Sequence, residues 1–252
     1  MESRVILITQ ARIGSSRLPS KVMKEIGGIS LLEMQLIRIM QCKTVDEIIV
    51  AIPSGDDQRP IQNICKKLGI QFYQGSEVNV LERFYLTGKK FNADWIVRIT
   101  SDCPLIDPEL IDHITNKVIS GNKDYGSNTL VESYPDGQDI EVFKFSVLED
   151  SISKVELNSD KEHVTPFIKR NCDTHQGTLY SSISFVSDID YSSVRMTVDE
   201  VQDFEAISLL VSKFGIFSTW KEYTNYILNN ISEFSNQKIL RNEGYFRSLQ
   251  ND

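Results

Sequence analysis

A short segment rich in small residues carries three positive charges that could bind an anion. Arg12, Arg17 and Lys21 lie within residues 10–21, among glycine, serine and proline residues. Glycine and serine let the backbone curl and direct its N–H groups toward one point, which forms an anion-binding nest. Arginine binds phosphate oxygens through a planar fork, and lysine adds a mobile point charge. The segment therefore predicts a ligand with several negative charges, such as a nucleoside triphosphate.

This basic loop differs from the common phosphate-binding motifs, because neither GxxxxGK[ST] nor GxGxxG occurs in it. The alternative is a solvated basic loop with no ligand. The apolar run at residues 5–8 directly precedes the loop and is typical of a buried strand. Ligands of parallel sheets bind outside the carboxyl ends of the strands, so the position of the loop favours ligand binding.

Two aspartates follow other predicted strands. Asp102 comes after residues 94–100, and Asp199 comes after residues 195–198. Either residue could have a local role, Asp102 in a turn and Asp199 as a helix cap. Two carboxylates beside a phosphate-binding loop are also what Mg²⁺ requires, since this ion binds one or two carboxylates together with water and substrate phosphates.

Strand-like and helix-like segments alternate in the first half of the chain. Short apolar runs predict buried strands at residues 5–8, 47–52, 70–73 and 94–100. Between them, apolar residues at helical spacing predict helices that begin near Ser30, Pro60, Asn79 and Asp107. The alternation predicts an α/β fold with a mostly parallel, doubly wound sheet.

The pattern changes after about Gly121. We expect strands at residues 140–145, 178–186 and 195–198, and helices at residues 159–170 and from Val201. Residues 130–190 are interpreted as an inserted, partly antiparallel arm of a domain that spans residues 1–218. Residues 219–252 are expected to form an amphipathic helical tail, to which the sequence assigns no function.

Charge and composition exclude several classes of partner. Among the 252 residues, 27 are Lys or Arg and 35 are Asp or Glu, so the formal net charge is 27 − 35 = −8. This balance argues against general binding to nucleic acid or to an anionic membrane. No apolar run approaches the roughly 18 residues of a membrane span. The four cysteines form no CxxC pair and are expected to be reduced thiols in a cytoplasmic protein.

Several motifs together resemble a known enzyme family. Residues 11–21, with Gly27-Gly28, are similar to the opening motif of the cytidylyltransferases that make CMP-activated acidic sugars, including the CMP-sialate and CMP-ketodeoxyoctonate synthetases. Further motifs resemble the branch known from spore coat polysaccharide synthesis, in chain order at residues 75–85, 98–107, 136–143, 162–168 and 195–200. The resemblance covers about residues 4–212. Ser20 and Ser101 stand where that branch usually has glycine, and Ile29-Ser30 where it commonly has Lys-Pro.

The resemblance implies a Rossmann-like nucleotidyltransferase sheet and transfer of CMP from CTP to an acidic sugar of the nonulosonic or ulosonic type. Pyrophosphate would be released, and the product would serve surface polysaccharide or glycan synthesis. The resemblance also implies Mg²⁺ held by Asp102 and Asp199. Arg12, Arg17 and Lys21 would act with Asp102 as catalytic residues. The implied nucleotide-binding set is Ala11, Arg12, Gly14, Ser15, Arg17, Lys21, Ser76, Val80 and Arg83.

The acceptor is expected to lie against the inserted arm, where Asp139, Glu141 and His163 are the polar candidates. His163 has two equally weighted interpretations, as an acceptor-binding or proton-relaying group and as a structural histidine. His113 and His175 are expected at the surface. Related cytidylyltransferases pair through this region, which predicts a homodimer. Apolar residues that the arm would need a partner to bury are Val164, Phe167, Ile168, Ile183 and Phe185.

Three alternatives remain open. The chain could be a catalytically inert nucleotide-binding protein, although the five charged motif residues are all present. It could be a sugar-transferring enzyme, but the usual DxD pair is missing at Asp102, where Cys103 and Pro104 follow. Within cytidylyl transfer, the acceptor could be a phosphonate or a polyol phosphate.

Overall fold

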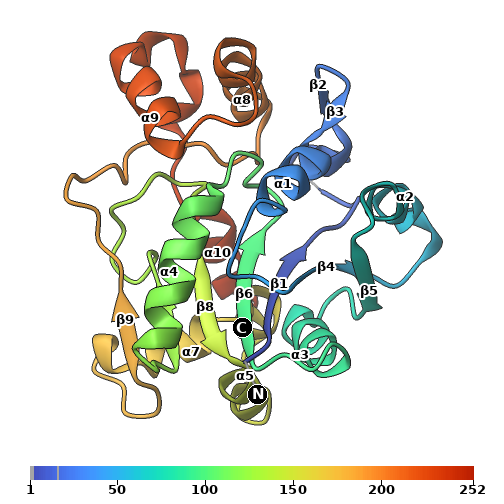
Figure 1. Ribbon diagram of the computed structural model, residues 1–252, viewed down its shortest axis with the longest axis vertical. Coiled ribbons are helices and arrows are strands. Elements are labelled where there is room, and N and C mark those ends of the chain that lie inside the picture. Colours follow the sequence, from blue (N-terminus) through green and yellow to red (C-terminus); the bar gives the residue numbers. More distant parts are fainter. Residues whose placement is uncertain (1–2, 16) are drawn as a thin grey trace.

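The computed structural model describes residues 3–15 and 17–252 (Figure 1). Its strands are β1 (Val5–Gln10), β2 (Glu25–Ile26), β3 (Ile29–Ser30), β4 (Glu47–Pro53), β5 (Gln71–Gly75), β6 (Trp95–Thr100), β7 (Tyr125–Ser127), β8 (Glu141–Lys144) and β9 (Ser182–Ser184). The described residues form a seven-stranded sheet in the order β5-β4-β1-β6-β8-β7-β9 and a small β2-β3 sheet. Strands β1, β4, β5 and β6 are parallel, whereas β8 is antiparallel to both β6 and β7. The prediction of an α/β fold with a mostly parallel sheet is confirmed.

Helices cover both faces of the sheet (Figure 1). They are α1 (Leu31–Ile39), α2 (Arg59–Leu68), α3 (Val80–Lys90), α4 (Pro108–Ser120), α5 (Phe145–Ile152), α6 (Asn158–His163), α7 (Pro166–Arg170), α8 (Val201–Phe214), α9 (Trp220–Asn229) and α10 (Glu243–Ser248). Short 3₁₀ turns are η1 (Lys21–Met23), η2 (Asp56–Gln58), η3 (Asp173–His175), η4 (Ile231–Glu233), η5 (Ser235–Lys238) and η6 (Leu249–Asn251). In the described part of the chain, no helix is both long and apolar enough to cross a membrane.

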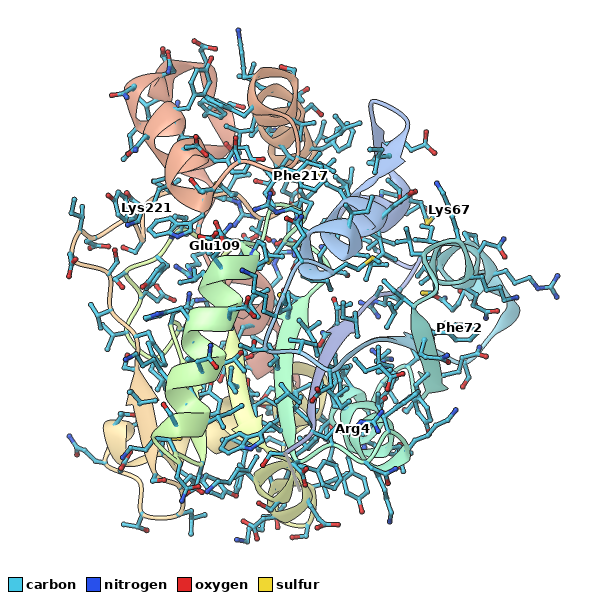
Figure 2. All side chains as sticks on the ribbon, in the orientation of Figure 1. Arg4, Lys67, Phe72, Glu109, Phe217 and Lys221 are labelled. Carbon is cyan, nitrogen blue, oxygen red and sulfur yellow. The ribbon has the colours of Figure 1, made fainter. Side chains whose placement is uncertain are left out.

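Strand β1 is apolar because it is buried on both faces. Val5 and Leu7 pack in a core with α1, α2 and α4, whereas Ile6 and Ile8 pack in a second core with α3, α5 and α7. This alternation follows from the pleat, which directs successive side chains to opposite faces. A third core joins the far side of α1 to α8 and α9. Side chains fill the spaces between the sheet and these helices (Figure 2).

The helix predicted at residues 159–170 is wrong, because two short helices replace it. Val164 lies between α6 and α7 with φ 72° and ψ −53°, a backbone conformation that interrupts the helix. Pro166 then begins α7 at a position where proline is tolerated. The interruption buries Val164 and places His163 at the end of α6.

The strand predicted at residues 195–198 does not form. This segment is extended, but it makes one isolated bridge, between Arg195 and Asp136. Its apolar residues are buried because α8 and α9 pack over them, so burial alone does not identify a strand. The strand predicted at residues 178–186 shortens to β9, and the one at residues 140–145 ends where α5 begins.

The apolar residues of the predicted arm are covered within the chain. Val164 and Ile168 are fully buried against α3 and α5, and Phe167 packs beside them. Ile183 and Phe185 pack against the core beneath α4. The expectation of burial by a second subunit is therefore wrong for Val164 and Ile168, whereas the other three stay partly exposed, and the homodimer stays a prediction.

A substitution of Gly137 tests a close backbone contact next to the site. Its φ is 107°, and a Cβ at this position would lie 2.6 Å from the carbonyl carbon of Met196 and 2.7 Å from the nitrogen of Thr197. Since both neighbours are backbone atoms, we expect Gly137→Ala to lower the free energy of unfolding by about 2–5 kcal/mol in chemical denaturation. The matched control is Gly14→Ala, where the added Cβ would meet no described atom within 4 Å. An unfolding midpoint of Gly137→Ala equal to that of the control would contradict the close approach of the Met196–Thr197 backbone.

Candidate functional site

The basic loop leaves the carboxyl end of β1 and ends in η1, close to both aspartates. The Lys21 ammonium donates hydrogen bonds to Asp199 Oδ1 at 2.8 Å and to the Val198 carbonyl at 2.9 Å, and lies 3.5 Å from Asp102 Oδ2. Arg17 Nη2 also contacts Asp199 Oδ1, at 2.8 Å. The structure therefore brings Arg17, Lys21, Asp102 and Asp199 together, although only Asp102 follows a strand as predicted. Ser16, in the same loop, lies outside the described residues.

Ser20 has a left-handed backbone conformation, with φ 53° and ψ 32°. Glycine adopts this conformation without steric cost, whereas an L-residue costs about 1 kcal/mol. Serine therefore adopts this conformation at some cost in stability. Ser101, the other departure, is buried after β6 and lines the site.

Buried polar side chains fix the loop that carries Asp102. The Gln35 amide on α1 donates to the carbonyls of Thr100 and Cys103, at 2.7 and 3.1 Å. From the other side, the Val198 N–H and the Thr197 hydroxyl donate to the Asp102 carbonyl. These contacts hold the backbone of the Asp102 loop and of the Asp199 segment in one place.

Asp199 is free of the capping role that the sequence left open. Glu200 is the N-cap of α8, and Asp203 completes the capping box. The Asp203 carboxylate accepts the N–H groups of Asp199 and Glu200 at 2.9 Å and binds the Arg195 guanidinium through both oxygens. Asp203 therefore satisfies the backbone and leaves the Asp199 carboxylate to face the cations.

Opposite charges shift the pKa values at this point. Burial alone would raise the pKa of Asp102, but the Lys21 ammonium and hydrogen bonds from Thr100 and Cys103 outweigh it, so the pKa is lowered. Burial would likewise lower the pKa of Lys21, but Asp102 and Asp199 outweigh it and the pKa is raised. The lysine is therefore charged and both carboxylates have a cation beside them.

Two adjacent cavities meet at these charges. One of about 620 Å³ lies over the basic loop and the start of α3, and we call it the nucleotide-side cavity. The other, of about 440 Å³, lies over the inserted region, and we call it the acceptor-side cavity. The residues that line both are Arg17, Arg98, Thr100, Asp102, His163 and Asp199.

Most of the predicted nucleotide-binding residues line the nucleotide-side cavity: Ala11, Arg12, Gly14, Ser15, Arg17, Lys21, Val80 and Arg83. Ser76 lies behind them, because its carbonyl accepts a hydrogen bond from Arg83 Nη1 at 2.7 Å and its hydroxyl accepts one from the Asn79 N–H. Burial, reinforced by Arg12, lowers the pKa of Arg83 to about 10. Arg12 is half exposed and lies 3.8 Å from Glu77 at the mouth.

Glu141 lies at the buried base of the acceptor-side cavity. It accepts hydrogen bonds from Arg98, Tyr125 and Thr165, and Lys169 lies 3.0 Å away. Burial would raise the pKa of Glu141, but Lys169 and Arg98 hold it far below its usual range. This carboxylate positions the cations around it, whereas Asp139 is more accessible and pairs with Arg241 at 2.6 Å.

His163 lies between the two cavities and is held by the C-terminal region. Its Nε2 is 2.9 Å from the Ser248 hydroxyl, and its ring packs edge-on against Tyr245 with 5.2 Å between centroids. Burial, together with the charges of Arg98 and Lys169, lowers its pKa to about 4. The imidazole is therefore neutral at neutral pH.

Several residues of the site were missing from the sequence prediction. Arg98 interrupts the apolar run of β6, and this buried charge was a signal that could have found it. His175, expected at the surface, is exposed but lines the acceptor-side cavity. Lys169 and Arg241 carried no local signal, because only the fold brings α7 and the C-terminal segment to β8.

A metal ion fits the Asp102–Asp199 pair only with help from a substrate. Both carboxylates already approach one positive charge, the Lys21 ammonium, so their oxygens converge. Within residues 3–15 and 17–252, no group of three or more His, Cys, Asp or Glu side chains could hold a metal ion. Two carboxylates suit Mg²⁺ where water and substrate phosphates supply the other ligands.

The lowered pKa of His163 predicts a pH dependence of stability. As the pH falls from 6.5 toward 4, the unfolded chain takes up a proton on this histidine before the folded chain does, so stability is lost in that range. Between pH 6.5 and 4 we expect the free energy of unfolding of His163→Gln to fall by about 2–3 kcal/mol less than that of wild type. Denaturant unfolding at several pH values measures this difference. The matched control is His113→Gln, at an exposed position of α4. The same slope in His163→Gln and wild type would contradict a buried neutral imidazole.

Comparisons with known proteins identify the family of this chain. The chain matches the cytidylyltransferase family over residues 6–244. It is 30% identical over 217 residues to the spore coat polysaccharide biosynthesis protein SpsF of Bacillus subtilis, covering 84% of this chain and 88% of that protein. It is 34% identical over 135 residues to a mitochondrial 3-deoxy-manno-octulosonate cytidylyltransferase of Arabidopsis thaliana, covering 52% of this chain and 45% of that protein.

A solved structure extends the similarity to nearly the whole chain. The structure of a cytidylyltransferase from Leptospira borgpetersenii superposes with a TM-score of 0.88 at 28% identity, covering 95% of this chain and 100% of that one. The family match extends beyond the resemblance at residues 4–212 and includes α9 and the start of α10. The chain therefore belongs to the cytidylyltransferase family.

Proposed function

We propose that the protein transfers CMP from CTP to an acidic sugar of the nonulosonic or ulosonic type and releases pyrophosphate. The observation that carries this proposal is the meeting of two cavities at one set of charges. One cavity is lined by the basic loop, and the other by polar residues of the inserted region. Such a junction suits a reaction in which an acceptor oxygen attacks a phosphorus atom of a nucleotide.

The basic loop would bind the triphosphate. Arg17 and Lys21 now contact Asp199, and the phosphate oxygens would take over these cations when CTP binds. Arg12 is more exposed and would close on the phosphates from the mouth of the cavity. Holding the α-phosphorus in line with the acceptor and stabilising the leaving pyrophosphate are the main contributions that such a site makes to the rate.

Asp102 and Asp199 would hold Mg²⁺ once Lys21 turns toward the triphosphate. When bound, the ion would draw charge from the phosphate oxygens during attack. The lowered pKa of Asp102 keeps its carboxylate ionised and ready to bind a cation.

The acceptor-side cavity suits a molecule with both hydroxyl and anionic groups. Asp139 and Glu141 offer oxygens that accept hydrogen bonds from hydroxyls, although most of the capacity of Glu141 is used within the protein. His163 lies at the junction as a neutral imidazole, which can accept a hydrogen bond from an acceptor hydroxyl. The names of SpsF and of the 3-deoxy-manno-octulosonate cytidylyltransferase support a polysaccharide-related acidic sugar.

Nucleotide and acceptor choice can be tested together by pyrophosphate release. The full chain is incubated with each of the four nucleoside triphosphates and Mg²⁺, against N-acetylneuraminate, 3-deoxy-manno-octulosonate and a polyol phosphate. We expect release with CTP and an acidic sugar, since the family transfers cytidylyl groups. Equal or faster release with ATP or GTP would overturn the choice of CTP, and release with the polyol phosphate alone would overturn the acidic sugar.

The Asp102–Asp199 pair predicts variants that lose activity but keep most of their stability. Asp102→Asn and Asp199→Asn remove a charge without changing shape, and each leaves the other carboxylate to pair with Lys21. We expect turnover at saturating CTP to fall by about 100-fold or more, with only a small change in melting temperature.

The matched control is Glu205→Gln on the exposed face of α8, which removes the same charge far from the cavities. Turnover is measured across a series of Mg²⁺ concentrations. Near-normal activity of either aspartate variant throughout the series would rule out the two-carboxylate site.

A further inference from the structure

The C-terminal segment, residues 239–252, forms part of the wall of the acceptor-side cavity. Residues 240–245 line this cavity, although the sequence alone predicts no function for this end of the chain. Figure 1 shows α10 apart from α8 and α9, which lie at the upper edge of the view. After α9 the chain therefore returns to the site.

Polar contacts fasten this segment across the cavity. Near its beginning, Asn242 Nδ2 donates a hydrogen bond to Glu132 at 2.8 Å. Near its end, the Ser248 hydroxyl lies 2.9 Å from His163 Nε2, and Asp252 accepts a hydrogen bond from the Ser159 N–H at 2.7 Å. Fixed at both ends, the backbone presents its side chains to the cavity in a defined place.

Arg241 is the cation that this segment brings to the cavity. Its Nη2 donates to Asp139 at 2.6 Å and its Nη1 to the Tyr134 carbonyl at 3.2 Å. Its Nε is buried and makes no hydrogen bond to the described residues, although Glu132 lies 3.5 Å away. The Nε therefore has only this longer ion pair with Glu132.

The partners of Arg241 distinguish it from the other cations of this cavity outside the basic loop. Those cations neutralise carboxylates whose side chains are almost completely buried, namely Glu141 (4% exposed), Asp160 (1%) and Asp203 (0%). They cannot bind a ligand without leaving a buried charge unpaired, which is costly. The partners of Arg241 are Asp139 (31% exposed) and Glu132 (43%), which can turn to water. Replacing the carboxylate partner of Arg241 by a ligand therefore costs less free energy than replacing the partners of the other cations.

The segment also reaches the nucleotide side of the site. A Cβ on Gly244 would lie 3.7 Å from Arg17 Nη2, the cation assigned to the triphosphate. An anion held by Arg241 would thus lie next to the junction of the two cavities.

We propose that Arg241 binds the anionic group of the acceptor, a carboxylate or a phosphate, in place of Asp139. This inference rests on the proposed function and adds to it the residue that selects a charged acceptor. A planar guanidinium can hold either group through two parallel hydrogen bonds. The Asp139 carboxylate, once released, is free to accept hydrogen bonds from acceptor hydroxyls.

Steady-state kinetics of the full chain test the proposal. CTP and Mg²⁺ are supplied with N-acetylneuraminate, 3-deoxy-manno-octulosonate or glycerol 3-phosphate, and KM is measured separately for CTP and for the acceptor that wild type uses. We expect Arg241→Gln to raise the acceptor KM about 10- to 100-fold and to leave the CTP KM within about twofold. Arg241→Lys keeps the charge but loses the fork, so its acceptor KM should lie between those of wild type and Arg241→Gln. The Lys variant alone decides the matter if the Gln variant does not fold.

The matched control is Arg4→Gln, at an exposed arginine whose partner is Glu47, because neither residue lines either cavity. It should behave as wild type. An unchanged acceptor KM in the Arg241 variants, or a parallel rise in both KM values with a lower melting temperature, would overturn the role of Arg241 while the proposed function stands. If wild type uses none of the acceptors, the proposed function fails and this inference fails with it. Use of glycerol 3-phosphate with the same KM effect would keep Arg241 as the anion-binding residue and change only the acceptor class.

Discussion

Mutual neutralisation of charges at the carboxyl edge of the sheet is the constraint on which the site depends. Asp102 and Asp199 approach each other closely enough to share the Lys21 ammonium, and Arg17 contacts Asp199 as well. Without these cations, two carboxylates in a partly buried crevice would repel each other, and one would be protonated. A polyanionic nucleotide can enter only by exchanging partners with them. The charges that neutralise one another at this site are thus the same charges that would bind a triphosphate.

The surrounding fold confines this exchange of ion-pair partners to side chains. Gln35 and Thr197 hold the backbone on both sides of Asp102, and Asp203 holds the backbone of Asp199. The fixed groups are buried and fully used in these contacts, so the side chains that face the cavities can change partners without moving the strands. A similar division holds at the acceptor side, where buried Glu141 fixes Arg98 and Lys169 while the accessible Asp139 pairs with Arg241.

The C-terminal region belongs to both the core and the site. Helix α9 contributes Tyr223 and Ile227 to the third core, and Asn236 is buried against Asp203 and Arg195. The last residues then contact His163 and Asp139, two of the predicted acceptor-binding residues. A segment that the sequence described only as an amphipathic tail therefore supports the fold and also forms a wall of the acceptor-side cavity.

The sequence by itself determined the parallel sheet, the position of the basic loop and the strand end that carries Asp102. Buried strands and amphipathic helices each produce a short-range period of apolar residues, which the sequence shows directly. Parallel strands also place their carboxyl ends at one edge of the sheet. The tertiary structure alone decided that residues 195–198 stay outside the sheet, that Val164 divides one predicted helix into two, and that the far end of the chain meets Asp139 and His163. Those outcomes depend on packing and charge pairing between distant residues, such as Arg241 and Asp139, which are 102 positions apart. No local pattern of residue types encodes which distant partner each side chain will find.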